Sequence, residues 1–168
     1  MEQTNTPSEK NLFKGFAPND NGQKEITVNG TKIKGDWVEG YLFQRHIIVP
    51  AGQGIDYAKY GDKNIITSDN CLEFYIVIPE TVCQYTGKKN TFEFDLIKHN
   101  FGNEIGVIRY GSYRNPFLDD RSTEHVGFYV DWVVGEEKEL LRKDLGYWLA
   151  VTEIAGNIFE NPNLARQQ

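Results

Sequence analysis

Short runs of β-branched and aromatic residues, each ended by Gly, Asn or Pro, are the feature that most restricts how this chain can fold. The clearest example is residues 25–33, EITVNGTKI, in which apolar residues flank Asn29-Gly30. Asn-Gly readily adopts the positive φ angles of a two-residue type I′ turn, so this stretch predicts a β-hairpin. Several similar runs along the chain predict a fold built mainly from antiparallel strands.

Six further segments have the composition of strands; they are residues 36–43, 46–50, 71–79, 91–99, 104–111 and 125–134. The last part of 71–79 is continuously apolar, so we expect a central strand that is buried on both faces. Residues 51–64 contain three glycines and no sustained period, which predicts a long surface loop.

Residues 136–145, EEKELLRKDL, are the one stretch with a convincing helical composition. Acidic residues open it and Arg142 and Lys143 lie near its end, which suits the helix dipole. Gly146 stands where a C-cap is expected.

Residues 147–160 are then expected to return to strands, because they are rich in aromatic and β-branched residues. In the last of these strands, Ile154, Gly156 and Ile158 should share one face. Asn161-Pro162 should stop the ladder and begin a final turn or short helix.

Composition supports a β-rich α+β fold with one short helix, because 13% of the residues are aromatic and 16 are glycine. The chain has 168 residues, no internal repeat and no proline-rich linker. We therefore expect a loose polar arm at 1–11 and a single domain at 12–168, with a division into subdomains 12–87 and 88–168 as the alternative.

Charge and cysteine content limit the partners and the compartment. Asp and Glu total 24 against 18 Lys and Arg, a net charge of −6, so binding to nucleic acid would need a local basic patch. Cys71 and Cys83 fit neither a CxxC spacing nor a disulfide framework, which favours reduced thiols in the cytoplasm. The polar first residues and the lack of a long apolar run predict neither a secretory signal nor a membrane span.

The residues that could carry chemistry form no recognisable catalytic motif. His46, His99 and His125 are isolated in sequence, and no phosphate-binding glycine motif is present, so we expect neither a metal nor a cofactor. Cys83 could act as a nucleophile, but a structural role is favoured. Five carboxylates could supply an acid and base pair, although turn and surface roles are favoured; these are Glu80, Glu93, Asp95, Asp119 and Asp120. We therefore expect a protein that is not an enzyme.

Residues 106–117, GVIRYGSYRNPF, contain the candidate binding residues. Cations and aromatic side chains alternate there as they do on surfaces that stack bases and contact phosphates; the residues are Arg109, Tyr110, Tyr113, Arg114 and Phe117. The alternative is that Tyr110 packs in the core and the two arginines pair with the acidic excess.

Four separated motifs carry a resemblance to a known family. They are IPETVCQYTG (78–87), FEFDLI (92–97), IGVIRYG (105–111) and EIAGNIFENPNL (153–164), and FKG (13–15) and DWVEGYL (36–42) precede them. In sequence and order they resemble the YopX-like family of phage and prophage proteins. The chain departs from the family pattern in a shortened loop after Gly87 and in Phe94, where the family usually has Gly.

The resemblance implies an α+β protein rich in antiparallel strands, with a small barrel-like sheet toward the C-terminus, encoded by a mobile element and located in the cytoplasm of a bacterial host. It implies no established biochemical activity. Our leading hypothesis is a non-enzymatic interaction module, a homo-oligomer formed through exposed sheet edges and aromatic faces, with a phage or host protein as a further partner. The alternative is a small barrel that associates with nucleic acid through Arg109, Tyr113 and Arg114. A small hydrolase using Glu80, Asp95 or a histidine would require a shared pocket.

Overall fold

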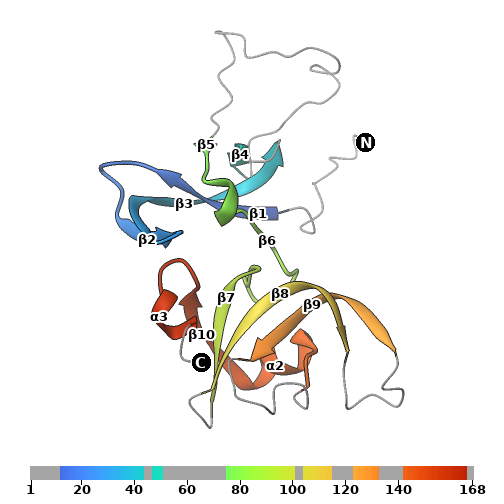
Figure 1. Ribbon diagram of the computed structural model, residues 1–168. Coiled ribbons are helices and arrows are strands. Elements are labelled where there is room, and N and C mark those ends of the chain that lie inside the picture. Colours follow the sequence, from blue (N-terminus) through green and yellow to red (C-terminus); the bar gives the residue numbers. More distant parts are fainter. Residues whose placement is uncertain are drawn as a thin grey trace, which may run out of the picture. The chain divides into compact units, whose positions relative to one another are not determined.

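The computed structural model describes residues 12–43, 47–50, 75–100, 104–114, 123–132 and 142–165 (Figure 1). Its sheets are antiparallel and its helices are few and short, which confirms the expected β-rich α+β class. The N-terminal arm, the loop at 51–64 and residues 136–141 of the predicted helix lie outside the described residues. The chain divides into two compact units, one comprising 1–24 and 34–84, the other 25–33 and 85–168.

One sheet contains the strands of the N-terminal half in the order β5-β4-β3-β1-β6, and β2 pairs with β3. The strands are β1 (Leu12–Pro18), β2 (Lys24–Val28), β3 (Thr31–Phe43), β4 (Ile47–Pro50), β5 (Tyr75–Ile76) and β6 (Cys83–Gln84). Between β2 and β3, Asn29 and Gly30 have φ angles of 51° and 80°. The hairpin predicted from the Asn-Gly pair is therefore confirmed.

The prediction that the apolar run ending at Pro79 is a central strand is wrong. β5 is the outer strand of its sheet, and Tyr75 and Ile76 are 39% and 61% exposed. The buried member of the run is Val77, which follows the strand and lies close to the backbone of Gly15. A continuous apolar run can therefore belong either to a central strand or to a segment that follows an outer strand and anchors its end in the core. Composition alone does not distinguish a central strand from such an anchoring segment.

The 3-10 helix η2 (Pro79–Thr81) fastens this segment to β1. Thr81 is fully buried, and its hydroxyl accepts the backbone N–H of Phe16 at 2.9 Å and donates to the Ile78 carbonyl at 2.7 Å. The backbone N–H of Ile78 in turn donates to the Phe16 carbonyl at 2.9 Å. The segment IPET (78–81) therefore has a structural role.

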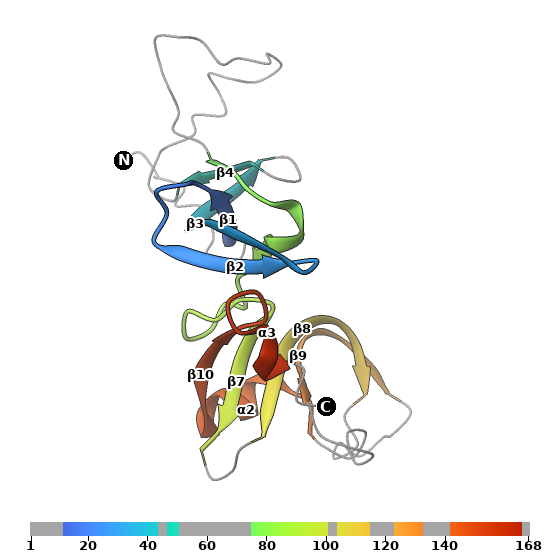
Figure 2. The same ribbon diagram turned by 60° about the vertical axis from the view of Figure 1, so that its left-hand side comes forward.

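The second unit contains a four-stranded sheet that curls into half a barrel, with strand order β10-β7-β8-β9 (Figures 1 and 2). Its strands are β7 (Asp95–His99), β8 (Ile105–Arg114), β9 (Glu124–Trp132) and β10 (Thr152–Asn157). Two apolar clusters lie on this sheet. One contains Ile97, Ile108, Val130 and Trp132 with helix α2 (Leu145–Val151); the other contains Leu96, Ile105 and Val107, with helix α3 (Pro162–Ala165) packed against it.

Helix α2 occupies residues for which the sequence predicts a strand, and Gly146 lies in its first turn rather than at a C-cap. The Asp144 side chain accepts the backbone N–H of Tyr147 and so caps the helix. Leu145 and Leu149, four residues apart, are both buried in the core. N-capping and one buried helix face together outweigh the strand propensity of the aromatic residues.

The C-terminal motif forms a bulged strand followed by a tight turn. Ile154 pairs with Ile97 and Gly156 with Leu96, so the register shifts between Ile154 and Gly156 and the predicted common face of Ile154, Gly156 and Ile158 is wrong. Asn157 Oδ1 then accepts the backbone N–H groups of Phe159 and Glu160, both at 2.9 Å. Helix α3 follows at Pro162, which confirms the predicted final turn or short helix.

Candidate functional site

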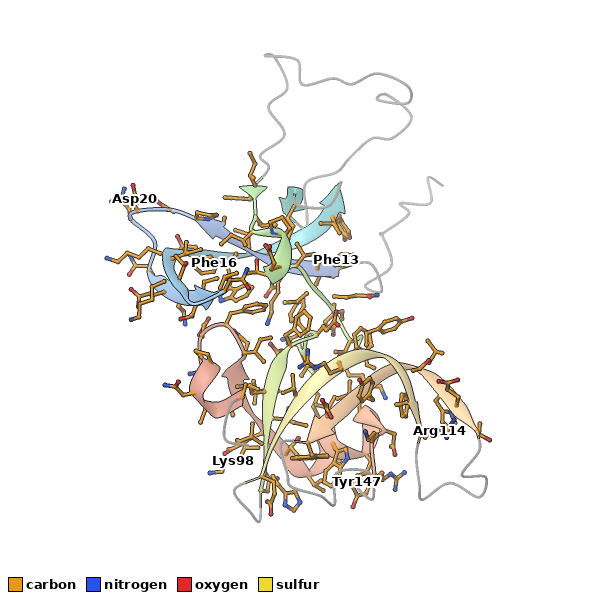
Figure 3. All side chains as sticks on the ribbon, viewed as in Figure 1. Phe13, Phe16, Asp20, Lys98, Arg114 and Tyr147 are labelled. Atoms are coloured by element: carbon orange, nitrogen blue, oxygen red, sulfur yellow. The ribbon has the colours of Figure 1, made fainter. Side chains whose placement is uncertain are left out.

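The candidate residues lie on the two-stranded ribbon formed by β8 and β9. The pairing runs from Gly106–Trp132 to Arg114–Glu124, and the first part of β8 is buried in the core. From Arg109 onward, half-buried and exposed residues alternate along β8. Figure 3 shows Arg114 at the end of the ribbon, well away from Lys98 of β7. Phe117 lies outside the described residues.

The register divides the candidate residues between two faces, because successive side chains of a strand point to opposite sides. We call one the Tyr113 face; it comprises Arg109, Gly111, Tyr113, His125, Gly127 and Tyr129. We call the other the Val126 face; it comprises Tyr110, Ser112, Arg114, Glu124, Val126 and Phe128. The strip predicted from the alternation of cations and aromatics is therefore distributed over both faces.

The Tyr113 face is covered by its own aromatic rings. The Tyr113 ring stacks on His125 and on Tyr129, with centroid distances of 5.4 and 5.3 Å. A Cβ added at Gly111 would lie 3.9 Å from the Tyr129 ring, whereas a Cβ added at the directly paired Gly127 would meet nothing within 4 Å. Because Tyr113 already stacks on two neighbours, its ring is poorly available to a base.

Charged groups on the Tyr113 face also have local partners. The Arg109 guanidinium lies 5.5 Å from the Phe94 ring centroid, and Lys143 Nζ lies 5.8 Å from that of Tyr129. Burial raises the pKa of the Glu93 carboxyl, although the backbone N–H of Tyr110 and the charge of Arg109 act in the opposite direction. Burial, followed by the charge of Asp131, raises the pKa of Tyr129. The two cations on or beside this face therefore lie next to aromatic rings, and the Glu93 carboxyl lies near the Arg109 cation.

The Val126 face is open. Tyr110 is 50% exposed and Val126 is 71% exposed, while Phe128 is half-buried with its ring 5.1 Å from that of Tyr110. The alternative that Tyr110 packs in the core is wrong, because the core on this side of β8 ends at Ile108. Arg114 and Glu124 face each other at the end of the ladder, and both are exposed.

Other candidate residues have structural partners. Cys83 is buried and its thiol donates to the Thr81 carbonyl at 3.0 Å. The buried Asp95 accepts the backbone N–H of Phe92 at 2.8 Å. His99 packs edge-on against Trp132 and Trp148.

Glu80 lies in η2 of the first unit and Asp95 in the second unit. No group of three His, Cys, Asp or Glu residues within the described ranges could hold a metal ion. Four other residues that the sequence singles out lie outside those ranges; they are His46, Cys71, Asp119 and Asp120.

Sequence reasoning missed Val126 and Phe128. The signal was available in the run at 125–134, where Val126, Phe128 and Val130 occupy alternate positions. It was obscured because Val126 and Phe128 belong to the same alternating apolar set as Val130 and Trp132, a pattern that predicts burial in the core rather than an exposed surface. Pairing with β8 is needed to show that Val126 and Phe128 lie beside Tyr110.

No family model, curated protein or solved structure matches the chain. Among the helices of the described segments, none is long and apolar enough to cross a membrane.

Proposed function

We propose that this protein is a non-enzymatic interaction module that associates with itself through the Val126 face. The supporting observation is that Val126 and Tyr110 are exposed beside the half-buried Phe128 on a regular, fully paired ribbon. Apolar surface removed from water stabilises association by about 25 cal/mol per Å². Neighbouring exposed apolar side chains on an otherwise ordered sheet are typical of protein contact surfaces.

We further propose that the chain is a phage- or prophage-derived protein of the YopX-like family that acts in the cytoplasm of a bacterial host, where a phage or host protein is a further partner. The support is the sequence resemblance in IPETVCQYTG (78–87) and EIAGNIFENPNL (153–164). Both motifs form turns and strand ends, so the resemblance bears on the fold rather than on an activity.

Sedimentation velocity over a concentration series tests the proposed self-association. We expect wild-type protein to form a species larger than the 19.3 kDa chain. Val126→Lys should shift the equilibrium toward the monomer, because it places a charge in the apolar contact. The matched control is Ile154→Lys on β10, where the replaced side chain is 50% exposed; it should leave the equilibrium unchanged. Equal effects of the two variants would contradict the assignment of the surface.

A nucleic-acid interface on the Tyr113 face is the second candidate. The Arg109 guanidinium lies over the Phe94 ring and Lys143 Nζ lies over the Tyr129 ring, so each of these two cations lies beside an aromatic side chain. Fluorescence anisotropy with a labelled single-stranded oligonucleotide at low salt tests this candidate. Binding that is lost in Arg109→Ala with Lys143→Ala, but retained in Arg114→Ala on the Val126 face, would favour it. No binding by wild-type protein would reject it.

A further inference from the structure

We infer that two copies of the chain join edge to edge, β9 against β9, about a two-fold axis that is perpendicular to the sheet and passes beside His125. The inference rests on the proposed function and adds the contact between the copies and its register. β9 is an outer strand of its sheet. Within the described residues, β9 pairs on its outer side at one place, where Tyr129 is bridged to Asp144. There the Val130 N–H donates to the Lys143 carbonyl at 2.9 Å.

The register of β9 shows which of its backbone groups point away from β8. The N–H and C=O groups of one residue point to the same side of a strand, and the side alternates from residue to residue. The Val130 N–H points outward, and the ladder between β8 and β9 has no bulge. The backbone groups of Val126 and Glu124 therefore also point outward. These two residues present two N–H and two C=O groups to a further strand.

β9 lacks the features that usually protect an edge strand from pairing with another chain, which are lysine, proline, bulges and short length. It has nine residues, with neither Lys nor Pro, and it pairs with β8 in regular register. The opposite edge strand, β10, has a bulge between Ile154 and Gly156. The unprotected edge also carries Val126, which is 71% exposed. A two-fold axis allows the same strand of a second copy to pair with this edge.

Three antiparallel registers bring Glu124 or Val126 beside a second copy, and two of them are unfavourable. An axis at Val126 brings Glu124 of the second copy opposite Phe128. That position adjoins the bridged Asp144, directly before helix α2. An axis at Glu124 places two carboxylates opposite each other, and like charges there are destabilising. An axis at His125 places Glu124 of each copy opposite Val126 of the other, which allows four hydrogen bonds between the strands.

The junction extends the sheet sideways and leaves its two faces as they are in one chain. Helix α2 packs on Val130 and Trp132, so an axis at His125 keeps the two α2 helices at opposite ends of the junction. The two Val126 side chains become diagonal neighbours on one face, which removes part of their apolar surface from water. Four hydrogen bonds and this small apolar contact support a weak association that depends on concentration.

Cysteine cross-linking tests the register. The two His125 residues would form a non-hydrogen-bonded pair, whose Cα atoms lie about 4.5 Å apart and so within disulfide range. With oxidised glutathione, His125→Cys in a Cys71→Ser background should form a covalent dimer with twice the mass of the 19.3 kDa chain. The matched control is Ser112→Cys in the same background, an exposed position on β8, which should remain monomeric. Equal cross-linking of the two variants would overturn the register.

Proline substitution tests the backbone contact. Glu124→Pro removes an outward N–H at the first position of β9, where proline is tolerated because the ladder with β8 does not use this N–H. It breaks two of the four hydrogen bonds between copies and should weaken self-association about tenfold in sedimentation velocity. Glu124→Ala keeps the N–H and should leave association nearly unchanged. Equal effects would contradict edge pairing, and far-ultraviolet circular dichroism establishes that both variants are folded.

The outcomes separate this inference from the proposed function. If Val126→Lys weakens association while His125→Cys forms no covalent dimer, the Val126 face is the contact and the edge register is wrong. If wild-type protein is monomeric at every concentration, both the function and the edge pairing fail.

Discussion

Thr81 shows at the residue scale how one hydroxyl can hold two segments together. It is fully buried and bonds both the N–H of Phe16 and the carbonyl of Ile78. Thr81→Val keeps the shape but removes the hydroxyl from both backbone groups, so we expect a loss of about 1–3 kcal/mol in the free energy of unfolding. Urea denaturation measures the loss. Thr81→Ser retains the hydroxyl and should lose less; an equal loss would show that the methyl group contributes as much as the two hydrogen bonds.

Gly156 is required by two independent features of the bulge. Its φ angle is +128°, and a Cβ there would lie 2.0 Å from Asn161 Oδ1. Gly156→Ala should therefore destabilise the protein by about 1–3 kcal/mol or more in urea denaturation, through backbone strain and a clash. Gly87→Ala is the matched control, since Gly87 has φ +78° but an added Cβ would meet nothing within 4 Å. Equal losses in the two variants would contradict the role assigned to Asn161.

Glu93 predicts a pH dependence of stability. Burial raises the pKa of its carboxyl above the ordinary value of 4.5 in the folded protein. The protonated group therefore contributes stability that is complete below about pH 4.5 and is lost as the pH rises through the folded pKa. Relative to Glu93→Gln, the wild type should become less stable as the pH rises from about 4 through the folded pKa of this carboxyl. Urea denaturation of both proteins across this range measures the difference, and a difference that does not change with pH would contradict the prediction.

At the scale of elements, helix α2 depends on its cap because it has only seven residues. Asp144 accepts the Tyr147 N–H and also contacts Arg142. Asp144→Ala should cost about 1 kcal/mol in the free energy of unfolding, measured by urea denaturation. Asp144→Asn keeps a capping oxygen and should retain most of the stability. A loss of the same size in both variants would show that charge, rather than capping, stabilises the helix.

Local signals predicted some elements and failed for others. The hairpin at 25–33 was predictable because Asn29-Gly30 specifies its turn without help from the rest of the chain. Helix α2 was not, because its stability comes from burying Leu145 and Leu149 against strands distant in sequence. The outer position of β5 and the bulge in β10 likewise depend on pairing partners that no local pattern specifies.

The candidate site was only partly predictable for the same reason. The sequence identified Arg109, Tyr110, Tyr113 and Arg114 as residues of interest, but spacing along one strand does not reveal which residues of β9 lie opposite. The register assigns Tyr113 to a ring stack and Tyr110 to an exposed face with Val126. The function of each residue therefore follows from the cross-strand pairing rather than from its own identity.

At the scale of the whole molecule, the central claim is that the chain associates with itself and needs no nucleic acid to do so. The most direct measurement is the mass in solution by light scattering over a concentration series, with and without a short DNA duplex. We predict a mass above 19.3 kDa that rises with concentration and is unchanged by the duplex. A constant mass of 19.3 kDa that increases only when the duplex is added would contradict this claim and favour the nucleic-acid interface on the Tyr113 face.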